Sequence, residues 1–221
     1  MLQGQRTVPM KIKICGLTSA AAVAHAADAG AAYVGFNFYP PSPRSLELDA
    51  ARALAEGAPA GVARVALVVD ADNPFLDRLV ATVPLDMLQL HGHESPERVT
   101  EIRARSGLPV MKVIGIRDAG DVSLIAEYEA VADQLLIDAK PPRDGDGYLP
   151  GGNALSFDWR LIAGRRWVRP WLLASGLTAA NVATAVRLTG AEQVDVSSGV
   201  ESTRGVKDLD KISAFIRAAS E

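Results

Sequence analysis

The feature that most constrains this chain is a regular alternation of short apolar runs with segments of helical pattern. Eight runs rich in Val, Ile and Leu are predicted to be buried strands: KIKICGL (11–17), YVGFNF (33–38), ARVALVV (63–69), MLQLHG (87–92), PVMKVIGI (109–116), QLLIDA (134–139), WLLASG (171–176) and QVDVSSG (193–199). Eight Ala-rich or amphipathic segments follow them, at 19–29, 49–57, 73–83, 95–106, 119–131, 156–163, 178–188 and 207–219. Because each pair of parallel strands needs a crossover, this pattern matches a closed (β/α)8 barrel.

The competing architecture is an open, doubly wound parallel sheet. That fold usually carries a G-x-G-x-x-G turn after its first strand, whereas CGLTSA (15–20) contains one glycine. No change of composition along the 221 residues marks a second domain. The sequence therefore predicts an α/β protein, a single-domain (β/α)8 TIM barrel at residues 10–221, after a disordered tail at residues 1–9.

Charge and hydropathy exclude several classes of partner. The formal net charge of −3 gives no general attraction to nucleic acid or to an anionic membrane surface. No segment approaches the ~20 uninterrupted apolar residues that span a bilayer, and the first ten residues lack the apolar region of a signal peptide. The only cysteine, Cys15, cannot form an internal disulfide, so we expect a cytoplasmic protein without nucleic-acid or membrane partners.

Period-two alternation within the strands predicts which polar side chains face the inside of the barrel. With the apolar residues turned to the helices, the inward residues near the carboxyl ends of the strands are Lys13, Cys15, Gln89, His91, Asp138, Asp195 and Ser197. Catalytic groups of barrels lie at these ends. The open end thus holds a thiol, two carboxylates, an amide and an imidazole.

Each of these residues also has a purely structural interpretation. Most free cysteines are small buried hydrophobes, so the position of Cys15 alone leaves both roles open. Asp138 ends the apolar run LLID, where a buried carboxylate is costly unless it is paired or used. Gln89, His91 and Asp195 could form a hydrogen-bonded network without chemistry.

Phosphate is a better candidate ligand than a metal ion. The chain has three histidines, and Gly92 is expected to end the strand between His91 and His93, so a nitrogen-ligated metal site would be incomplete. Barrels commonly bind phosphate through backbone N–H groups of the loops after strands seven and eight, here ASGLTAAN (174–181) and SSGVES (197–202). Gly176 and Gly199 allow close backbone approach there.

Two longer connections also follow strands, YPPSPRSLEL (39–48) and KPPRDGDGYLPGGNAL (140–155). Both are dense in Pro and Gly. Loops after the strands build the active face of a barrel, so we expect both to be functional, the alternative being disordered surface loops. PGGN (150–153) could add further amides to a phosphate site.

Seven blocks occur in the order found in one enzyme family: KICGLT (13–18), VGFNFYPPSPR (34–44), QLHGHE (89–94), LLIDA (135–139), GGNALSFDW (151–159), LASGL (173–177) and DVSSGVE (195–201). Together they resemble phosphoribosylanthranilate isomerase, the (β/α)8 enzyme of tryptophan biosynthesis. The resemblance extends over residues 11–219. Each block alone would be weak, but seven in order are specific.

The resemblance implies an Amadori rearrangement that opens the ribose ring and removes a proton from C2′, with Cys15 as general base and Asp138 as general acid. Arg44 would pair with the anthranilate carboxylate, and Gly152, Gly176, Ser198 and Gly199 would bind the phosphate. From their inward positions at the open end, we expect Gln89, His91 and Asp195 to bind the substrate. The implied partner is a small phosphorylated ribosyl anthranilate. No cofactor or metal is required, and we expect a monomer or a homodimer.

These roles make demands on two pKa values. Burial among apolar neighbours should raise the pKa of Asp138, so that its carboxyl is partly protonated near neutral pH. A nearby cation should lower the pKa of the Cys15 thiol, and Lys13 is the candidate on the same face, although it lies deeper in the barrel.

Two departures from the family pattern stand out. The family usually has Gly-Gly-Thr-Gly where this chain has Gly151 to Ala154, which bears on the phosphate contact of that loop. It usually has Pro-Gly where this chain has Arg204-Gly205, at the entry to the last helix.

Three alternatives stay open from the sequence. One is the related isomerase of histidine biosynthesis, which resembles a two-aspartate design and fits poorly with Cys15 in place of the first aspartate. The others are a bifunctional barrel and a non-catalytic barrel that binds a phosphorylated ligand, which would need neither Cys15 nor Asp138.

Overall fold

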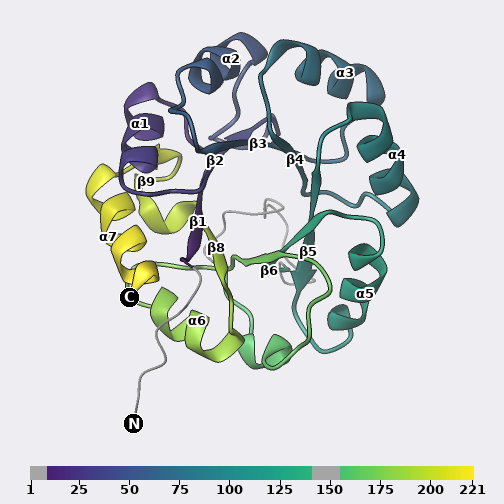
Figure 1. The fold of residues 1–221 in the computed structure, drawn as a ribbon, viewed down its shortest axis with the longest axis vertical. Helices are drawn as coiled ribbons and strands as arrows, with labels where there is room; N and C mark the ends of the chain where they lie inside the picture. Colours follow the sequence, from purple (N-terminus) through teal and green to yellow (C-terminus); the bar gives the residue numbers. More distant parts are fainter. Residues whose placement is uncertain (1–8, 141–154) are drawn as a thin grey trace.

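Eight short strands form one closed parallel sheet in the computed structural model, which describes residues 9–140 and 155–221. The strands are β1 (Lys11–Cys15), β2 (Tyr33–Asn37), β3 (Ala63–Val68), β4 (Met87–Leu90), β5 (Val110–Ile116), β6 (Gln134–Ala139), β7 (Trp171–Leu173) and β8 (Gln193–Val196). Each strand pairs with the next, and β8 pairs with β1 (Figure 1). The predicted barrel is confirmed, while all but Pro9 of the predicted tail lies outside the described residues.

Helices cover the outside of this barrel (Figure 1). They are α1 (Ala20–Asp28), α2 (Leu48–Glu56), α3 (Asn73–Thr82), α4 (Pro96–Ser106), α5 (Leu124–Glu129), α6 (Val182–Thr189) and α7 (Leu209–Ser220), with the 3-10 helices η1 (Asp121–Ser123), η2 (Trp159–Ile162) and η3 (Ser198–Val200). The predicted helices are therefore confirmed in place, with one exception between β6 and β7.

The α-helix predicted at 156–163 is wrong, because the structure has only the single 3-10 turn η2 there. The side chain of Asp158 caps this turn by accepting from the N–H of Arg160 at 3.0 Å, and Gly164 follows it with φ +69°. So few residues between a cap and a left-handed glycine cannot complete the costly nucleus of an α-helix.

The last predicted helix also begins later than expected. A small antiparallel hairpin, β9 (Glu201–Thr203) and β10 (Val206–Lys207), occupies the residues before α7. Gly205 makes its tight turn possible with φ +88°. This hairpin brings Glu201 and Lys207 to the active end of the barrel.

Alternation sorts the strand residues as predicted. The outward apolar residues join one core between sheet and helices, including Ile12, Ile14, Leu88, Leu90, Leu135, Ile137, Val194 and Val196. A smaller apolar cluster fills the inside of the barrel beside β5, β6 and β7: Met111, Val113, Leu136, Leu172 and Ala174. Buried polar side chains occupy the remaining interior near β1, β4 and β8.

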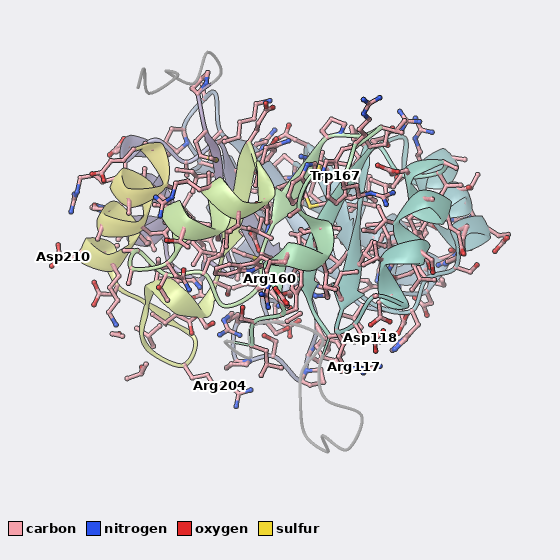
Figure 2. All side chains as sticks on the ribbon, turned by 90° about the horizontal axis from the view of Figure 1, so that it is seen from below. Arg117, Asp118, Arg160, Trp167, Arg204 and Asp210 are labelled. Carbon is pink, nitrogen blue, oxygen red and sulfur yellow. The ribbon has the colours of Figure 1, made fainter. Side chains whose placement is uncertain are left out.

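The two ends of the barrel carry different residues. Figure 2 shows Arg117, after β5, and Arg204, in the β9–β10 turn, at the end where the strands finish, with Trp167, which precedes β7, toward the opposite end. Among the described residues, no helix has the length and apolar character needed to cross a membrane.

Candidate active site

Cys15 ends β1 on the inner face of the barrel, next to Lys13. Lys13 is fully buried, and its Nζ donates a 2.8 Å hydrogen bond to Oδ1 of Asp195, its register partner on β8. A methyl group on Gly35 of β2 would lie 3.0 Å from Cys15 Sγ and 3.1 Å from Lys13 Nζ. The missing side chain at Gly35 therefore leaves room for thiol and ammonium to approach each other.

Burial raises the pKa of the Cys15 thiol, although the charges of Lys13 and Lys207 act to lower it. Asp195 adds to the rise, because its negative charge disfavours a thiolate. The predicted cation beside the thiol is present. The predicted net lowering of the thiol pKa is wrong, since loss of hydration outweighs the effect of the cation.

Asp138 is the penultimate residue of β6 and lies on the inner face, with 15% of its side-chain surface exposed. Burial raises its pKa to about 7, although its Oδ1 accepts a 2.8 Å hydrogen bond from the N–H of Ala139. The charge of Asp195 raises this pKa and that of Lys13 lowers it, so these groups share one site with Asp138. The predicted upward shift is confirmed.

His91 and Gln89 lie beside Asp138 and also face inward, as predicted. Nε2 of His91 is 3.7 Å from Oδ2 of Asp138, and its Nδ1 is 3.2 Å from Nε2 of Gln89. The Gln89 amide nitrogen can only donate, so this arrangement assigns the proton of a neutral His91 ring to Nε2. That proton then points toward the Asp138 carboxyl.

A second charged cluster contains Arg44, which lies in the loop after β2 and is 3% exposed. Its Nε and Nη2 donate to the two carboxylate oxygens of Glu201 at 2.7 and 2.9 Å. Lys207 donates to Glu201 Oε1 at 2.8 Å and to the carbonyl oxygen of Ser197 at 2.9 Å. Burial opposes ionisation of Glu201, yet the hydrogen bonds and charges of Arg44 and Lys207 lower its pKa to about 2.

The loops after β7 and β8 contact each other at the same end. Gly176 has φ +62°, and its carbonyl oxygen accepts from Nδ2 of Asn181 at 3.0 Å. Ser198 begins η3, and any side chain on Gly199 would collide with the carbonyl oxygen of Leu177. The structure thus brings the predicted phosphate residues of these two loops together, while Gly152 lies outside the described residues.

The second histidine of HGH turns away from the site. The side chain of His93 is 96% exposed, and its Nδ1 lies 3.2 Å from Oδ2 of Asp70. The strand ends before Gly92, as predicted, so His91 and His93 do not share a face. Across residues 9–140 and 155–221, no three His, Cys, Asp or Glu side chains form a group that could hold a metal ion.

Comparison with known proteins agrees with this geometry. Residues 12–218 match the family model described as N-(5'phosphoribosyl)anthranilate (PRA) isomerase. The chain belongs to this isomerase family. A member from Cereibacter sphaeroides is 63% identical over 210 residues, which cover 95% of this chain and 98% of that protein.

Two solved structures of PRA isomerases have the same fold. One, of monomers generated from the dimeric Thermotoga maritima protein, is 33% identical with a TM-score of 0.81. The other, in complex with reduced 1-(o-carboxyphenylamino)-1-deoxyribulose 5-phosphate, is 32% identical with a TM-score of 0.82. Each comparison covers 95% of this chain and 98% of the other chain. The resemblance found in the sequence blocks is therefore confirmed.

Sequence reasoning missed four charged residues of this chain. Glu201 and Lys207 lie in a hairpin that the alternation of strands and helices did not predict. Glu94 and Lys112 are 4% and 2% exposed and pair behind the strands, outside the barrel interior. The sequence did carry a signal for Lys112, because it stands at an outward position of the apolar run MKVIGI, where the other outward residues are aliphatic.

Proposed function

We propose that this chain catalyses the Amadori rearrangement of N-(5-phospho-β-D-ribosyl)anthranilate to 1-(2-carboxyphenylamino)-1-deoxy-D-ribulose 5-phosphate, a step of tryptophan biosynthesis. The observation that carries the mechanism is the pair formed by Asp138, with a pKa of about 7, and the Cys15 thiol at the same open end of the barrel. Family membership supplies the substrate class. An acid and a base are what this isomerisation needs.

In this mechanism Asp138 protonates the ring oxygen of the ribose, and the furanose opens to an iminium. Cys15, as thiolate, then takes the proton from C2′, which gives an enolamine. Tautomerisation of the enolamine places the carbonyl at C2′ and leaves the product an isomer of the substrate. Strands β1 and β6 stand three apart around the ring, so the two groups can approach the sugar from different sides.

The raised thiol pKa restricts which enzyme molecules can react. At neutral pH most molecules carry a neutral Cys15, and the reactive combination of a protonated Asp138 with a thiolate is a minor species. Since the pKa of Asp138 is about 7 and burial raises that of the thiol above its ordinary value, Asp138 loses its proton before Cys15 does as the pH rises. The ammonium of Lys13 is the group that keeps this minor species accessible.

We assign substrate binding to the charged cluster that contains Arg44 and to the loops after β7 and β8. The bidentate pair with Glu201 uses Nε and Nη2 of Arg44, and Nη1 remains to donate to the anthranilate carboxylate. Backbone groups of Gly176, Ser198 and Gly199 would bind the phosphate, together with Gly152. We propose that Gln89 and His91 contact the sugar, and that Asp195 acts on it through Lys13.

The remaining properties follow from this chemistry. The rearrangement requires no cofactor, and its partner is a small phosphorylated molecule. A catalytic thiol suits a reducing compartment such as the cytoplasm. The predicted oligomeric state remains a monomer or a homodimer.

The test is turnover of freshly made phosphoribosylanthranilate, followed by the loss of its fluorescence. We expect turnover by the wild-type chain that survives exhaustive dialysis against EDTA. The histidine-pathway substrate, assayed in parallel, should be left unchanged. Binding without turnover would refute the enzyme and favour a binding barrel, and turnover of both substrates would establish a bifunctional one.

A further inference from the structure

Lys112 is a buried charge in a place where the fold needs none. It lies on the outward face of β5 between sheet and helices, and it is 2% exposed. Ile114 and Ile116 on the same face belong to the apolar core. An ammonium loses its hydration there, so its presence requires compensating partners.

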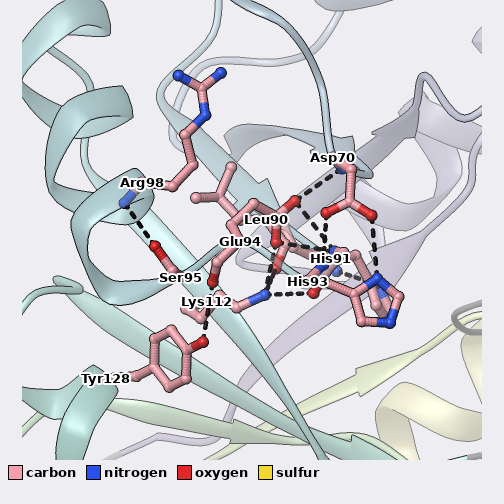
Figure 3. A network of polar contacts seen from close by, with 11 residues as sticks. Asp70, Leu90, His91, His93, Glu94, Ser95, Arg98, Lys112 and Tyr128 are labelled. Carbon is pink, nitrogen blue, oxygen red and sulfur yellow. Dashed lines mark hydrogen bonds and ion pairs between the residues drawn. The ribbon is translucent and has the colours of Figure 1, made fainter.

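Among the described residues, the hydrogen-bond partners of Lys112 come from the last residue of β4 and from the segment that follows it. Its Nζ donates to Oε2 of Glu94 at 2.6 Å, to the carbonyl oxygen of Gly92 at 2.7 Å and to that of Leu90 at 3.4 Å. The ammonium also lies 5.6 Å from the centre of the Tyr128 ring, a favourable cation–π arrangement. The charge is therefore directed at one short loop, residues 91–94, as Figure 3 shows.

Glu94 turns the same loop back toward β3. Its carboxylate accepts from the N–H of Gly92 at 3.0 Å and from the N–H of Asp70 at 2.9 Å. Asp70 in turn accepts from the N–H of His93 at 2.6 Å, and Tyr128 donates its hydroxyl to the carbonyl oxygen of Glu94 at 2.9 Å. The peptide groups on both sides of Gly92 are thus held by charged side chains.

The loop leaves little freedom for alternative conformations. A side chain on Gly92 would collide with the carboxylate of Asp70, and Asp70 itself has φ +47°, in the left-handed region. His91 directly precedes Gly92, whose peptide groups are held by these hydrogen bonds. The backbone N–H of His91 donates to the carbonyl oxygen of Val68 at 2.9 Å. Any shift of Gly92 therefore moves the imidazole that lies 3.7 Å from Asp138.

We propose that Glu94 and Lys112 are positioning residues for the reaction. Their ion pair, together with Asp70, fixes the loop after β4 from outside the barrel wall, and so sets the distance between the His91 ring and the Asp138 carboxyl. This inference rests on the proposed function, because the distance matters only if Asp138 transfers a proton. Proton transfer is steeply sensitive to such distances, since misplacement by about 1 Å can cost on the order of 100-fold in rate.

The test removes both charges together, in Glu94→Gln/Lys112→Met. A buried pair replaced as a unit usually leaves stability nearly unchanged, so we expect a melting temperature within about 5 °C of wild type. We expect kcat to fall by at least about tenfold while KM stays within about threefold, because the groups proposed to bind the phosphate and the carboxylate are untouched. The side-chain NMR signals of His91, assigned with His91→Asn among the three histidines, should shift.

Glu129→Gln is the matched control. Glu129 is a buried carboxylate that follows Tyr128 in α5, but its own side chain accepts from Arg165 at 3.1 Å and from the N–H of Val168 at 2.9 Å, toward the start of β7. We expect this variant to leave kcat and the His91 signals unchanged. Should the double variant not fold, Asp70→Ala offers a second test, because Asp70 is half-exposed and its carboxylate accepts from the N–H of His93. This variant must shift the side-chain NMR signals of His91.

The outcomes separate this proposal from the proposed function. A folded double variant with wild-type kcat and unshifted His91 signals would overturn the positioning role, even though the enzyme remained active. Shifted His91 signals in a protein whose wild type does not turn over the substrate would overturn the proposed function, and with it a catalytic purpose for the network. Equal loss of kcat in Glu129→Gln would indicate a general stability effect and would also refute the proposal.

Discussion

Asp138→Asn should make the protein more stable while it removes the proposed acid, and the gain in stability should grow with pH. Asparagine keeps the shape of the side chain and an oxygen that can accept from the N–H of Ala139. It carries no charge, so burial no longer opposes it. The stability cost of the buried carboxylate follows from its pKa, which is about 7 in the folded protein and about 3.9 in the unfolded chain.

The sign of the effect is set by which state holds the proton. Below about pH 4 the carboxyl is protonated in both states and contributes no difference. Between about pH 4 and 7 only the unfolded chain ionises, so each pH unit costs the wild type about 1.4 kcal/mol, up to about 4 kcal/mol above pH 7. Because 15% of the side chain is exposed, water relieves part of this cost, and we expect a gain of about 2 to 4 kcal/mol at pH 8.

Thermal or urea unfolding of wild type and Asp138→Asn at pH 4, 6 and 8 measures this difference. For a chain of this size, 1 kcal/mol corresponds to about 2–4 °C in Tm. Asp86→Asn serves as a control with the opposite sign, since hydrogen bonds from Arg64 hold the pKa of Asp86 below its ordinary value. Removal of the Asp86 carboxylate should therefore lower the stability of the protein, and most at high pH. Equal stability of Asp138→Asn and wild type at pH 8, or a gain that is independent of pH, would refute the reasoning.

Three further predictions concern the kinetics. The value of kcat/KM should rise tenfold per pH unit up to about pH 7, as Cys15 gains thiolate character. It should then stay level, because the gain of thiolate is cancelled by the loss of protonated Asp138, and fall above the pKa of the thiol. A maximum well below pH 7 would contradict this mechanism. Cys15→Ala should lose at least about 100-fold in kcat but bind a reduced product analogue within about tenfold of wild type, and turnover within tenfold of wild type would exclude the thiol as base. Arg44→Ala should lower kcat/KM by roughly 10–100-fold, and it should also reduce Tm because Glu201 loses its bidentate partner. Arg44→Lys keeps the charge and should therefore recover more stability than activity. Wild-type kinetics in the alanine variant would show that Arg44 does not belong to the site.

Most of the fold was predictable because it depends on local pattern. Each of the eight barrel strands appears where an apolar run predicted it, since a parallel strand covered on both faces has to be apolar and short. The error at η2 has a local cause as well, in a segment too short to nucleate a helix between Asp158 and Gly164. The β9–β10 hairpin escaped prediction because strands of two and three residues are too short to show alternation.

The candidate site was predictable only as far as side-chain direction. Alternation brought Cys15, His91 and Asp138 to one open end, and the structure places them there. The partners of these groups were not predictable in the same way, because they depend on contacts between distant segments. Arg44 and Glu201 are separated by 157 residues along the chain, and no local pattern reports that one neutralises the other.

The balance between these charges explains how an acidic protein can hold an anionic substrate. The whole chain carries a formal charge of −3, which would repel a phosphorylated carboxylate. Among the buried groups described at the barrel mouth, however, the basic side chains of Lys13, Arg44 and Lys207 pair with the carboxylates of Asp195 and Glu201. Asp138 does not add a full negative charge, because burial keeps it partly protonated at neutral pH. The burial that raises the Asp138 pKa therefore suits its proposed role as proton donor and also prevents a third carboxylate from cancelling the local positive charge that favours an anionic substrate.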